Sequence, residues 1–391
     1  MLKNSQLLFM DRFILLLYAF CVTFSMTPSI NAISLYLFVP LMGGVLIIKR
    51  NRAYYDSKYL YLYLILIIWM ALTAVTADNP DVAWRHMIRI LAAYIFSVVS
   101  FYLASKESFV KWLYLIIILY FVVVFYQASS GGQLVIAQSD KDRDQFEGVN
   151  ANMLAYFFFY ATFAIFMLLR LGKKEKFCPL IISSMLLLVF SVYLSLITAS
   201  RQVLLIQVPL IVTLLLAIYF RFSAKNLVKL FSILALVIVV GFPIFDGYFS
   251  DSLLAKRSME NVSDDSRLYL IRKAIDEGTN YPLLGMGPNN FALKYKMFTH
   301  NSYLELLVSS GFPAMLIYIY MLIRFVYLQI RRYRRTGDRT FLMFFIYACT
   351  FFVDNIFYVF VGNMWLMGLF FIVVGHSEHY YKSYIYETKR C

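Results

Sequence analysis

Long apolar runs separated by short polar segments recur along the whole 391-residue chain. Most runs hold about 17 to 20 residues, the length that an α-helix needs to cross the hydrocarbon core of a bilayer. The pattern therefore predicts an all-α, polytopic membrane protein with about twelve transmembrane helices. The expected spans are residues 10–27, 30–48, 59–76, 86–104, 112–128, 151–169, 180–198, 203–220, 230–246, 303–324, 340–354 and 357–374.

The polar segments between these runs are unequal in length. Most are short, but 129–150 and 247–302 are longer and have room for a functional site. Between the ninth and tenth spans, 247–302 is expected to form a long periplasmic loop that contains short amphipathic helices. No long linker or soluble-type repeat divides the chain, so residues 1–391 are expected to form a single integral membrane domain.

The chain is 61% hydrophobic and carries a net charge of +14. If the N-terminus is cytoplasmic, most of the 36 Lys and Arg residues fall in inner loops, while the outer side is slightly acidic. This is the asymmetry of the positive-inside rule. It accounts for the basic surplus without a nucleic-acid partner, and it places both termini in the cytoplasm and both longer polar segments outside.

The stretch "SRLYLIRKAIDEG" in the long loop has helical periodicity. Leu268, Ile271 and Ile275 are predicted to form one apolar face, flanked by Arg267 and Arg272. Such a helix would lie on the outer leaflet with its arginines at headgroup depth. Arginine binds phosphate oxygens with a planar fork and keeps its charge, so a lipid phosphate is a suitable ligand. The alternative is simple snorkelling of the two side chains.

Further polar candidates lie at the outer ends of other spans. Arg201 lies between the seventh and eighth spans within a long apolar region, and a charge there marks a functional candidate. Arg85 and Arg89 are one helical turn apart at the start of the fourth span. Arg143 and Asn152 precede and begin the sixth span. The alternatives are interfacial anchoring, pairing with nearby aspartates and, for the asparagine segment, a helix cap.

The tenth span begins with "THNSYLELL", where the pattern Ser302-x-x-Glu305 predicts a capping box. A capping box leaves His300 unexplained. Histidine changes its charge near neutral pH, so a histidine at the outer surface is a candidate general base. Asn301 beside it is a candidate ligand for the glycan.

Five motifs together resemble the O-antigen ligase and O-antigen polymerase family of bacterial membrane transferases, over a core at 150–375. They are "FEGVNANMLA", "TASRQVLL", "SRLYLIRKAI", "YPLLGMGPNNF" and "HNSYLELLVSSGFPA". In the last, His-Asn is followed by nine residues and Gly311, as in the family, although Ala314 departs from the usual pattern. Arg267, ten residues and Gly278 match a spacing associated with the polymerases.

The resemblance implies a metal-independent, inverting glycosyltransferase that needs no cofactor. It would take a glycan from undecaprenyl diphosphate at the periplasmic face of the bacterial inner membrane and join it to a sugar hydroxyl in O-antigen or capsule assembly. A polymerase of repeat units is favoured, and a ligase to lipid A core is the alternative. A chain-length regulator and membrane lipids are further expected partners. The implied catalytic residues are His300, Arg267 and Arg201, and the implied substrate-binding residues are Arg272, Arg143, Asn152, Asn301, Arg85 and Arg89.

Two other classes of function remain as alternatives. A flippase for lipid-linked sugars would need charged groups or broken helices near the membrane midplane, whereas the centres of the expected spans are nearly free of charge. A metal-dependent membrane glycosyltransferase would need acidic residues in the first outer loop, and "MTPSIN" at 26–31 has none.

Overall fold

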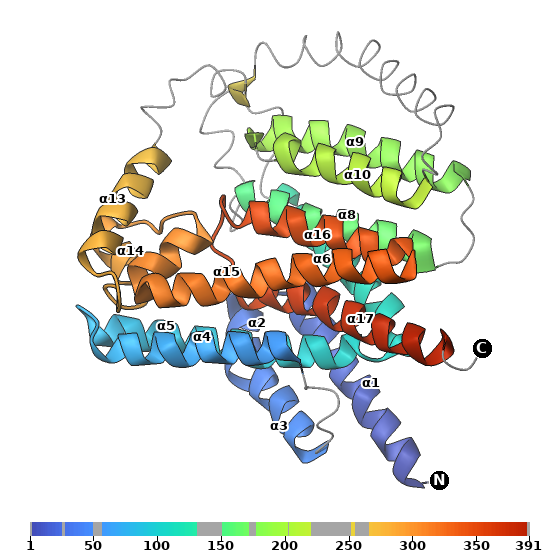
Figure 1. Ribbon diagram of the computed structural model, residues 1–391, viewed down its shortest axis with the longest axis horizontal. Coiled ribbons are helices and arrows are strands. Elements are labelled where there is room, and N and C mark those ends of the chain that lie inside the picture. The colour runs from blue at the N-terminus through green and yellow to red at the C-terminus, as the bar shows by residue number, and fades with distance from the viewer. Residues whose placement is uncertain are drawn as a thin grey trace. The chain divides into compact units, whose positions relative to one another are not determined.

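A computed structural model describes residues 2–25, 28–49, 57–130, 151–171, 177–201, 203–219, 252–254 and 266–388. Throughout these ranges the regular structure is helical, and no strand occurs in them (Figure 1). Chain contacts divide the protein into two compact units. The first comprises Met1–Ile116, Val262–Thr336 and Ala348–Cys391, and the second comprises Ile117–Asn261 and Gly337–Tyr347. Two helices, α6 (Glu107–Ser130) and α16 (Arg339–Asp354), run from one unit into the other.

The other helices of the first unit are α1 (Leu2–Thr23), α2 (Pro28–Ile33), the π-helical turn η1 (Ser34–Phe38), α3 (Val39–Lys49), α4 (Lys58–Val75), α5 (Pro80–Ala104), α13 (Ser266–Asn280), α14 (Asn290–Tyr295), α15 (Ser302–Thr336) and α17 (Met364–Thr388). Those of the second unit are α8 (Ala151–Leu171), α9 (Phe177–Thr198), the π-helical turn η3 (Val203–Gln207) and α10 (Val208–Tyr219).

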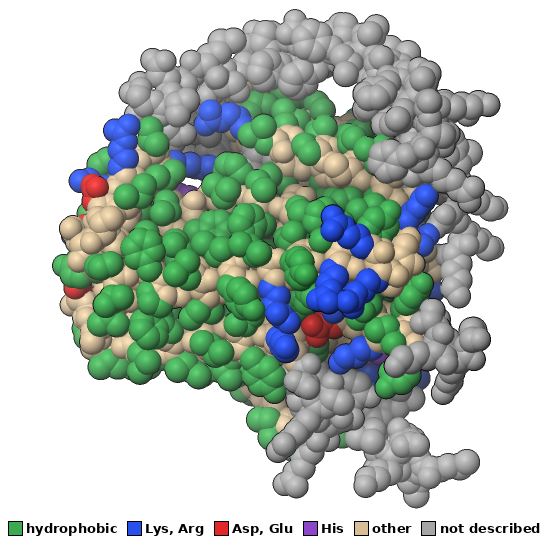
Figure 2. Space-filling model, in the orientation of Figure 1, with side chains coloured by type: hydrophobic (Ala, Val, Ile, Leu, Met, Phe, Trp, Pro, Cys, Tyr) green, Lys and Arg blue, Asp and Glu red, His purple; other side chains and the backbone are tan. Residues whose placement is uncertain are grey.

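Five helical stretches are long and apolar enough to cross a membrane. They are Asn31–Ile48, Lys58–Val75, Pro80–Ala104, Glu107–Gln127 and Ser302–Thr336, and shorter apolar helices accompany them. Figure 2 shows hydrophobic side chains across the face on which α4, α5 and α15 lie, with Lys and Arg around the C-terminal part of α15. These features confirm the predicted all-α, polytopic membrane class.

Most of the observed helices coincide with spans that were expected from the apolar runs. The expected span 230–246 lies outside the described residues. The start of the last span was predicted wrongly, because α17 begins at Met364 and not at 357. Residues 355–363 instead form a non-helical connection whose backbone bonds to the start of α15. An apolar composition alone cannot distinguish such a buried connection from another helical turn.

Local chemistry explains where α5 begins. Asn79 is the N-cap, and its Oδ1 accepts a hydrogen bond of 3.2 Å from Val82 N. Pro80 follows at a position where a helix needs no N–H donor. Further along α5, Phe96 and Phe101 contact α17 at Gly368 and Gly375, where an added Cβ would meet them at 2.4 and 2.8 Å. These glycines allow α5 and α17 to pack closely.

A break within α15 is the main irregularity of the first unit. Gly311 has φ 76° and ψ −178°, a conformation that is open only to glycine. Pro313 follows and has no N–H to donate. The break therefore removes the usual helical partners of the three carbonyl groups that precede it.

Other parts of the unit supply the missing donors. Val308 O accepts from Met286 N at 2.7 Å and Ser309 O from Gly287 N at 3.0 Å. Ser310 O accepts from the indole Nε1 of Trp69 at 2.9 Å. The segment 281–288 thus packs into the gap in α15 and replaces its hydrogen bonds, and an added Cβ on Gly285 would lie only 2.4 Å from Ser310 N.

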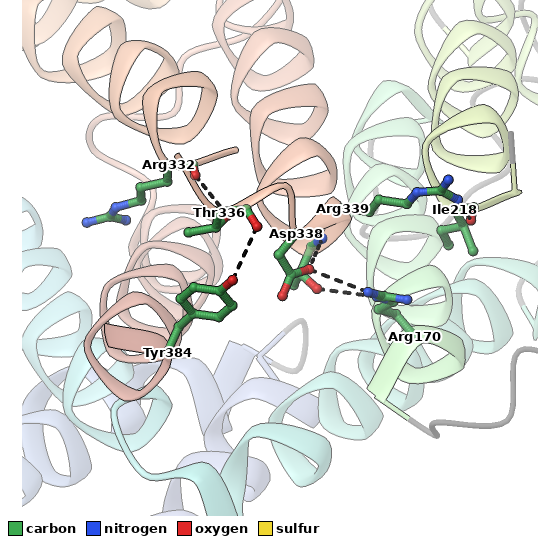
Figure 3. Close-up of polar contacts among 8 residues, drawn as sticks. Arg170, Ile218, Arg332, Thr336, Asp338, Arg339 and Tyr384 are labelled. Atoms are coloured by element: carbon green, nitrogen blue, oxygen red, sulfur yellow. Dashed lines mark hydrogen bonds and ion pairs between the residues drawn. The ribbon is translucent and has the colours of Figure 1, made fainter. Parts of the chain in front are cut away.

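The second unit is held by aromatic packing and by arginine contacts. Phe190 of α9 contacts the rings of Phe121 and Phe158. Arg170 at the end of α8 pairs with Asp338 at 3.4 Å, and Arg339 donates to the carbonyl of Ile218 at 2.6 Å, as Figure 3 shows. The second contact stabilises the C-terminal end of α10, where helix carbonyls lack intrahelical donors.

Candidate functional site

The turn Thr299–Asn301 precedes α15 and is fixed from both sides. Asn301 Oδ1 accepts hydrogen bonds from Tyr303 N at 2.9 Å and Leu304 N at 3.0 Å, so Asn301 is the N-cap of α15. The Glu305 carboxylate reaches back one turn to accept from Thr299 N and Thr299 Oγ1, both at 3.0 Å. The residue between these anchors is His300.

The predicted capping box is therefore wrong. The cap residue is Asn301 and not Ser302, and the Glu305 carboxylate bonds to Thr299 and not to the backbone N–H of the cap residue. Ser302 is fully buried, its Oγ donates to Tyr358 O at 2.8 Å, and the same oxygen accepts from Phe360 N at 2.9 Å. Ser302 thus joins the start of α15 to the connection between α16 and α17.

His300 itself has a left-handed backbone, with φ 55°. This conformation is uncommon outside glycine, and histidine, asparagine and aspartate adopt it more readily than most residues. Its half-buried ring lies 4.6 Å from the ring of Phe298, centroid to centroid. The imidazole is thereby held at a defined place in front of α15.

The arginine-bearing helix α13 packs against the protein through a face beside the predicted apolar one. The buried apolar residues are Leu270 and Ala274, whereas Leu268 and Ile271 are half-buried and Ile275 is exposed. Gly278 decides which side faces α15, because a Cβ there would lie 2.6 Å from the Leu307 side chain. Leu270 and Ala274 belong to the same core cluster as Val308 of α15.

Arg267 and Arg272 project from α13 outside that contact. Arg267 is half-buried and Arg272 is exposed. Figure 1 shows α13 slanting away from α14 and α15, with its first turn at the far end. Because a helix rises 1.5 Å per residue, Arg267 lies about 16 Å along α13 from the contact at Gly278. The Arg-x10-Gly spacing thus places Arg267 far along α13 from Gly278, the residue at which α13 packs against α15.

A carboxylate ties α13 to α14. Glu277 Oε1 accepts from Lys294 Nζ at 2.6 Å and from Tyr295 OH at 2.5 Å, and Glu277 is buried. Burial alone would raise the pKa of Glu277. The hydrogen bonds from Lys294 and Tyr295 outweigh burial and lower this pKa below its ordinary value of 4.5.

The α13–α14 contact should therefore weaken in acid. A carboxyl group whose pKa is lower in the folded state stabilises that state above its unfolded pKa, and this contribution is lost as the pH falls through the folded value. We expect the protection of α13 and α14 amides from hydrogen exchange, relative to their intrinsic exchange rates, to fall below about pH 4.5, because the unfolded reference pKa lies there. Glu277→Gln should show low protection at every pH, and equal acid sensitivity in this variant would contradict the assignment.

Arg85 and Arg89 are both exposed on the first turns of α5. Asn79, at the start of this helix, donates from its backbone N to Asn290 Oδ1 at 3.0 Å, and Asn290 Nδ2 donates back to Asn79 O at 3.3 Å. Asp78 N also donates to Met286 O at 3.1 Å. The start of α5 is thus bonded to the loop that fills the break in α15.

The remaining predicted site residues belong to the second unit. Arg201 is exposed and lies three residues after the end of α9, beyond Ala199, whose φ is 47°. Asn152 lies in the first turn of α8, but its side chain is outside the described structure, and Arg143 lies outside the described residues. His300, Asn301, Arg85, Arg89, Arg267 and Arg272 all belong to the first unit, in which α13 contacts α15, and α4 contacts both α15 and α5.

Sequence reasoning missed the residues that fix this arrangement. Ser302, Trp69 and Asn290 act through partners that are far away in the sequence, so no local pattern reveals them. Gly285 and Gly287 indicated only a turn, although both have positive φ at points of close approach. A sequence signal for these glycines does exist. Gly285 and Gly287 shortly precede α15, a helix that itself contains Gly311 and Pro313.

Helices of this length and apolarity, with a fixed polar turn at one helix start, define a multi-pass membrane protein with a candidate site at that turn. Residues 186–319 match the O-antigen ligase family, which confirms the resemblance to O-antigen ligases and polymerases. The matched stretch contains Arg201, Arg267, Arg272, His300 and Asn301. No curated protein matches the chain. The match supports a membrane enzyme that processes glycans in O-antigen assembly, with lipid-linked glycan and acceptor substrates.

Proposed function

We propose that this protein transfers a glycan from undecaprenyl diphosphate to a sugar hydroxyl at the periplasmic face of the bacterial inner membrane. We favour a polymerase, in which the acceptor is another lipid-linked repeat unit. The observation that carries the proposal is the fixed turn Thr299–Asn301, which holds an imidazole at a defined place within the stretch matching the family. Both termini would lie in the cytoplasm.

His300 would act as the general base. Asn301 and Glu305 hold the turn from its two ends, so the ring is positioned before substrate binds. As the acceptor hydroxyl attacks the anomeric carbon, the imidazole would take its proton. The bond between that carbon and the diphosphate oxygen breaks, undecaprenyl diphosphate leaves, and the configuration at the carbon inverts.

The arginines would stabilise the leaving group. Negative charge grows on the diphosphate as the glycosidic bond breaks, and fixed guanidinium groups stabilise that charge more in the transition state than in the bound substrate. Arg267 and Arg201 are proposed to hold the diphosphate, with Arg272 assisting. Arg85, Arg89, Arg143, Asn152 and Asn301 are proposed to contact the glycan. No metal is required in this mechanism, because the donor bond is already activated.

Reconstitution with defined lipid-linked repeat units tests the reaction. The purified protein should lengthen glycan chains that remain on the carrier lipid, both with and without a chelator. Loss of product on chelation would contradict the metal-free mechanism. Movement of the glycolipid across the bilayer without a new glycosidic bond would identify a flippase instead.

A ligase is the second candidate, and the description of the matched family favours it. Addition of lipid A core to the same reaction separates the two. A ligase would join the glycan to the core and would leave the repeat units unextended. A polymerase would extend them whether or not the core is present.

The role of Arg267 can be tested against a neighbour on the same helix. Arg267→Gln should reduce product formation at least about 100-fold, as expected for loss of a group that stabilises transition-state charge. Lys273→Gln removes the same charge from a residue whose side chain contacts Asp276 at 3.8 Å, and it should keep most of the activity. Equal loss in both variants would indicate only a general effect of charge.

A further inference from the structure

A polar cluster lies inside the first unit, where the second half of α15 packs between α4 and α17. Phe325, Gln329 and Arg332 recur at helical spacing on one buried face of α15. Arg332 Nη1 donates to Ser377 Oγ at 2.9 Å, and Ser377 Oγ donates to Gln329 Oε1 at 2.6 Å. The guanidinium of Arg332 also lies 4.7 Å from the ring centre of Tyr381.

Three buried polar atoms of this cluster have no hydrogen-bond partner among the described residues. They are the Tyr59 hydroxyl, Arg324 Nε and Gln329 Nε2. Tyr59 is fully buried, and its ring packs edge-on against Phe325 at 5.5 Å. It also lies within electrostatic range of Arg324 and Arg332. Buried donors without acceptors are costly, so their grouping at one place indicates a ligand that offers several acceptor atoms.

The charge of the cluster indicates an anion. Arg324 and Arg332 both interact with the carboxylate of Glu378, which also bonds to the Ser57 side chain and interacts with Lys382. Arg331 and Arg334 are exposed on the adjoining turns of α15. Among these described residues, positive charge exceeds negative charge. A phosphate group suits such donors best, because its oxygens accept several charge-assisted hydrogen bonds at once.

An apolar stripe leads to the same place. Leu316, Tyr320, Ile323 and Tyr327 recur along α15, and each is more than half exposed. Tyr320 lies within electrostatic range of Tyr59, so the stripe borders the cluster. A lipid could lay its acyl chains along the stripe while its phosphate reaches Arg324. Basic residues between transmembrane helices are suited to hold acidic lipid headgroups in this way.

We propose that α4, α15 and α17 form a binding site for the phosphate of an anionic phospholipid, with Tyr59, Arg324 and Gln329 as the donors. The site lies at the opposite end of α15 from His300 and does not depend on which glycan reaction the protein performs. It assigns a ligand to basic residues that would otherwise serve only as topology signals.

The full-length protein in detergent provides the test. Thermal unfolding is followed while phosphatidylglycerol, cardiolipin, phosphatidylcholine or inorganic phosphate is added, and native mass spectrometry counts the lipids that remain bound. We expect stabilisation by the two anionic lipids and little by phosphatidylcholine. Arg324→Gln and Tyr59→Phe should each weaken the anionic-lipid effect about tenfold or more, as expected for loss of a hydrogen bond to a charged group.

Arg334→Gln is the matched control, because it removes one exposed charge from the same helix. It should change the lipid effect less than twofold. An equal loss in Arg334→Gln and Arg324→Gln would overturn the site in favour of diffuse surface attraction. Stabilisation by inorganic phosphate alone would assign the site to a free anion and not a lipid. If Tyr59→Phe left lipid binding unchanged, the Tyr59 hydroxyl would not donate to a lipid phosphate, and the proposal would be overturned.

Discussion

His300→Asn is expected to lower product formation about 100- to 10,000-fold, the usual contribution of a general base, while the protein still inserts and folds. Asparagine is the informative replacement because the backbone at this position is left-handed, and asparagine tolerates that conformation better than alanine does. The loss would then reflect the missing imidazole and not a strained turn. Initial rates with lipid-linked repeat units measure it directly.

The pH dependence of the rate provides a second readout for His300. A general base must be deprotonated, so the rate of the unaltered protein should fall as the pH is lowered through the titration of this histidine. The residual rate of His300→Asn should lack that limb. As a control, Asn301→Ala removes the cap and should cost about 1 kcal/mol of stability, yet it should retain the pH limb. Undiminished activity in His300→Asn would rule out the base assignment.

Gly311→Ala is expected to cost more than about 3 kcal/mol of folding free energy, by two effects that add together. The backbone at Gly311 is one that alanine can hardly adopt. The new Cβ would also lie 2.2 Å from Leu283 O, so the loop would have to move away. That movement would break the hydrogen bond of 2.8 Å from Phe312 N to Pro282 O. Unfolding in detergent measures the loss.

Two other glycines separate these effects. Gly337 also has a positive φ, 68°, but an added Cβ would meet nothing within 4 Å, so Gly337→Ala should cost about 1 kcal/mol from the backbone alone. Gly44 lies in α3 with open space around it, and Gly44→Ala should be neutral or slightly stabilising. If Gly311→Ala is no worse than Gly337→Ala, the close approach of the loop is not important for stability.

The existence of the helices could be predicted from the sequence, but several of their ends could not. Apolar length determines whether a run can cross a bilayer, which is why most expected spans coincide with helices. At the start of α15, Asn301 and Ser302 are both good caps, and the choice depends on Tyr358 and Phe360, which bind Ser302 from beyond α16. Such partners cannot be read from a local pattern.

The candidate site was predictable as a set of residues but not as an arrangement. The charge pattern placed His300 and Arg267 in one outer segment, yet the packing of α13 through Gly278 leaves Arg267 about 16 Å along the helix from the contact. The apolar face at Leu268 and Ile275 stays a prediction, because a face that lies on a lipid leaflet is left uncovered by the protein itself, as Ile275 is. Arg201 belongs to the other compact unit, so the sequence could not relate it to His300.

The break at Gly311 has a consequence for how the chain enters the membrane. Within hydrocarbon, each unpaired backbone carbonyl costs several kcal/mol, and the carbonyls of Val308, Ser309 and Ser310 accept from Trp69 and the 281–288 loop. Both donors precede α15 in the chain and are synthesised before it. A fragment that starts at α15 would lack them, so the insertion of this helix depends on the segments already made.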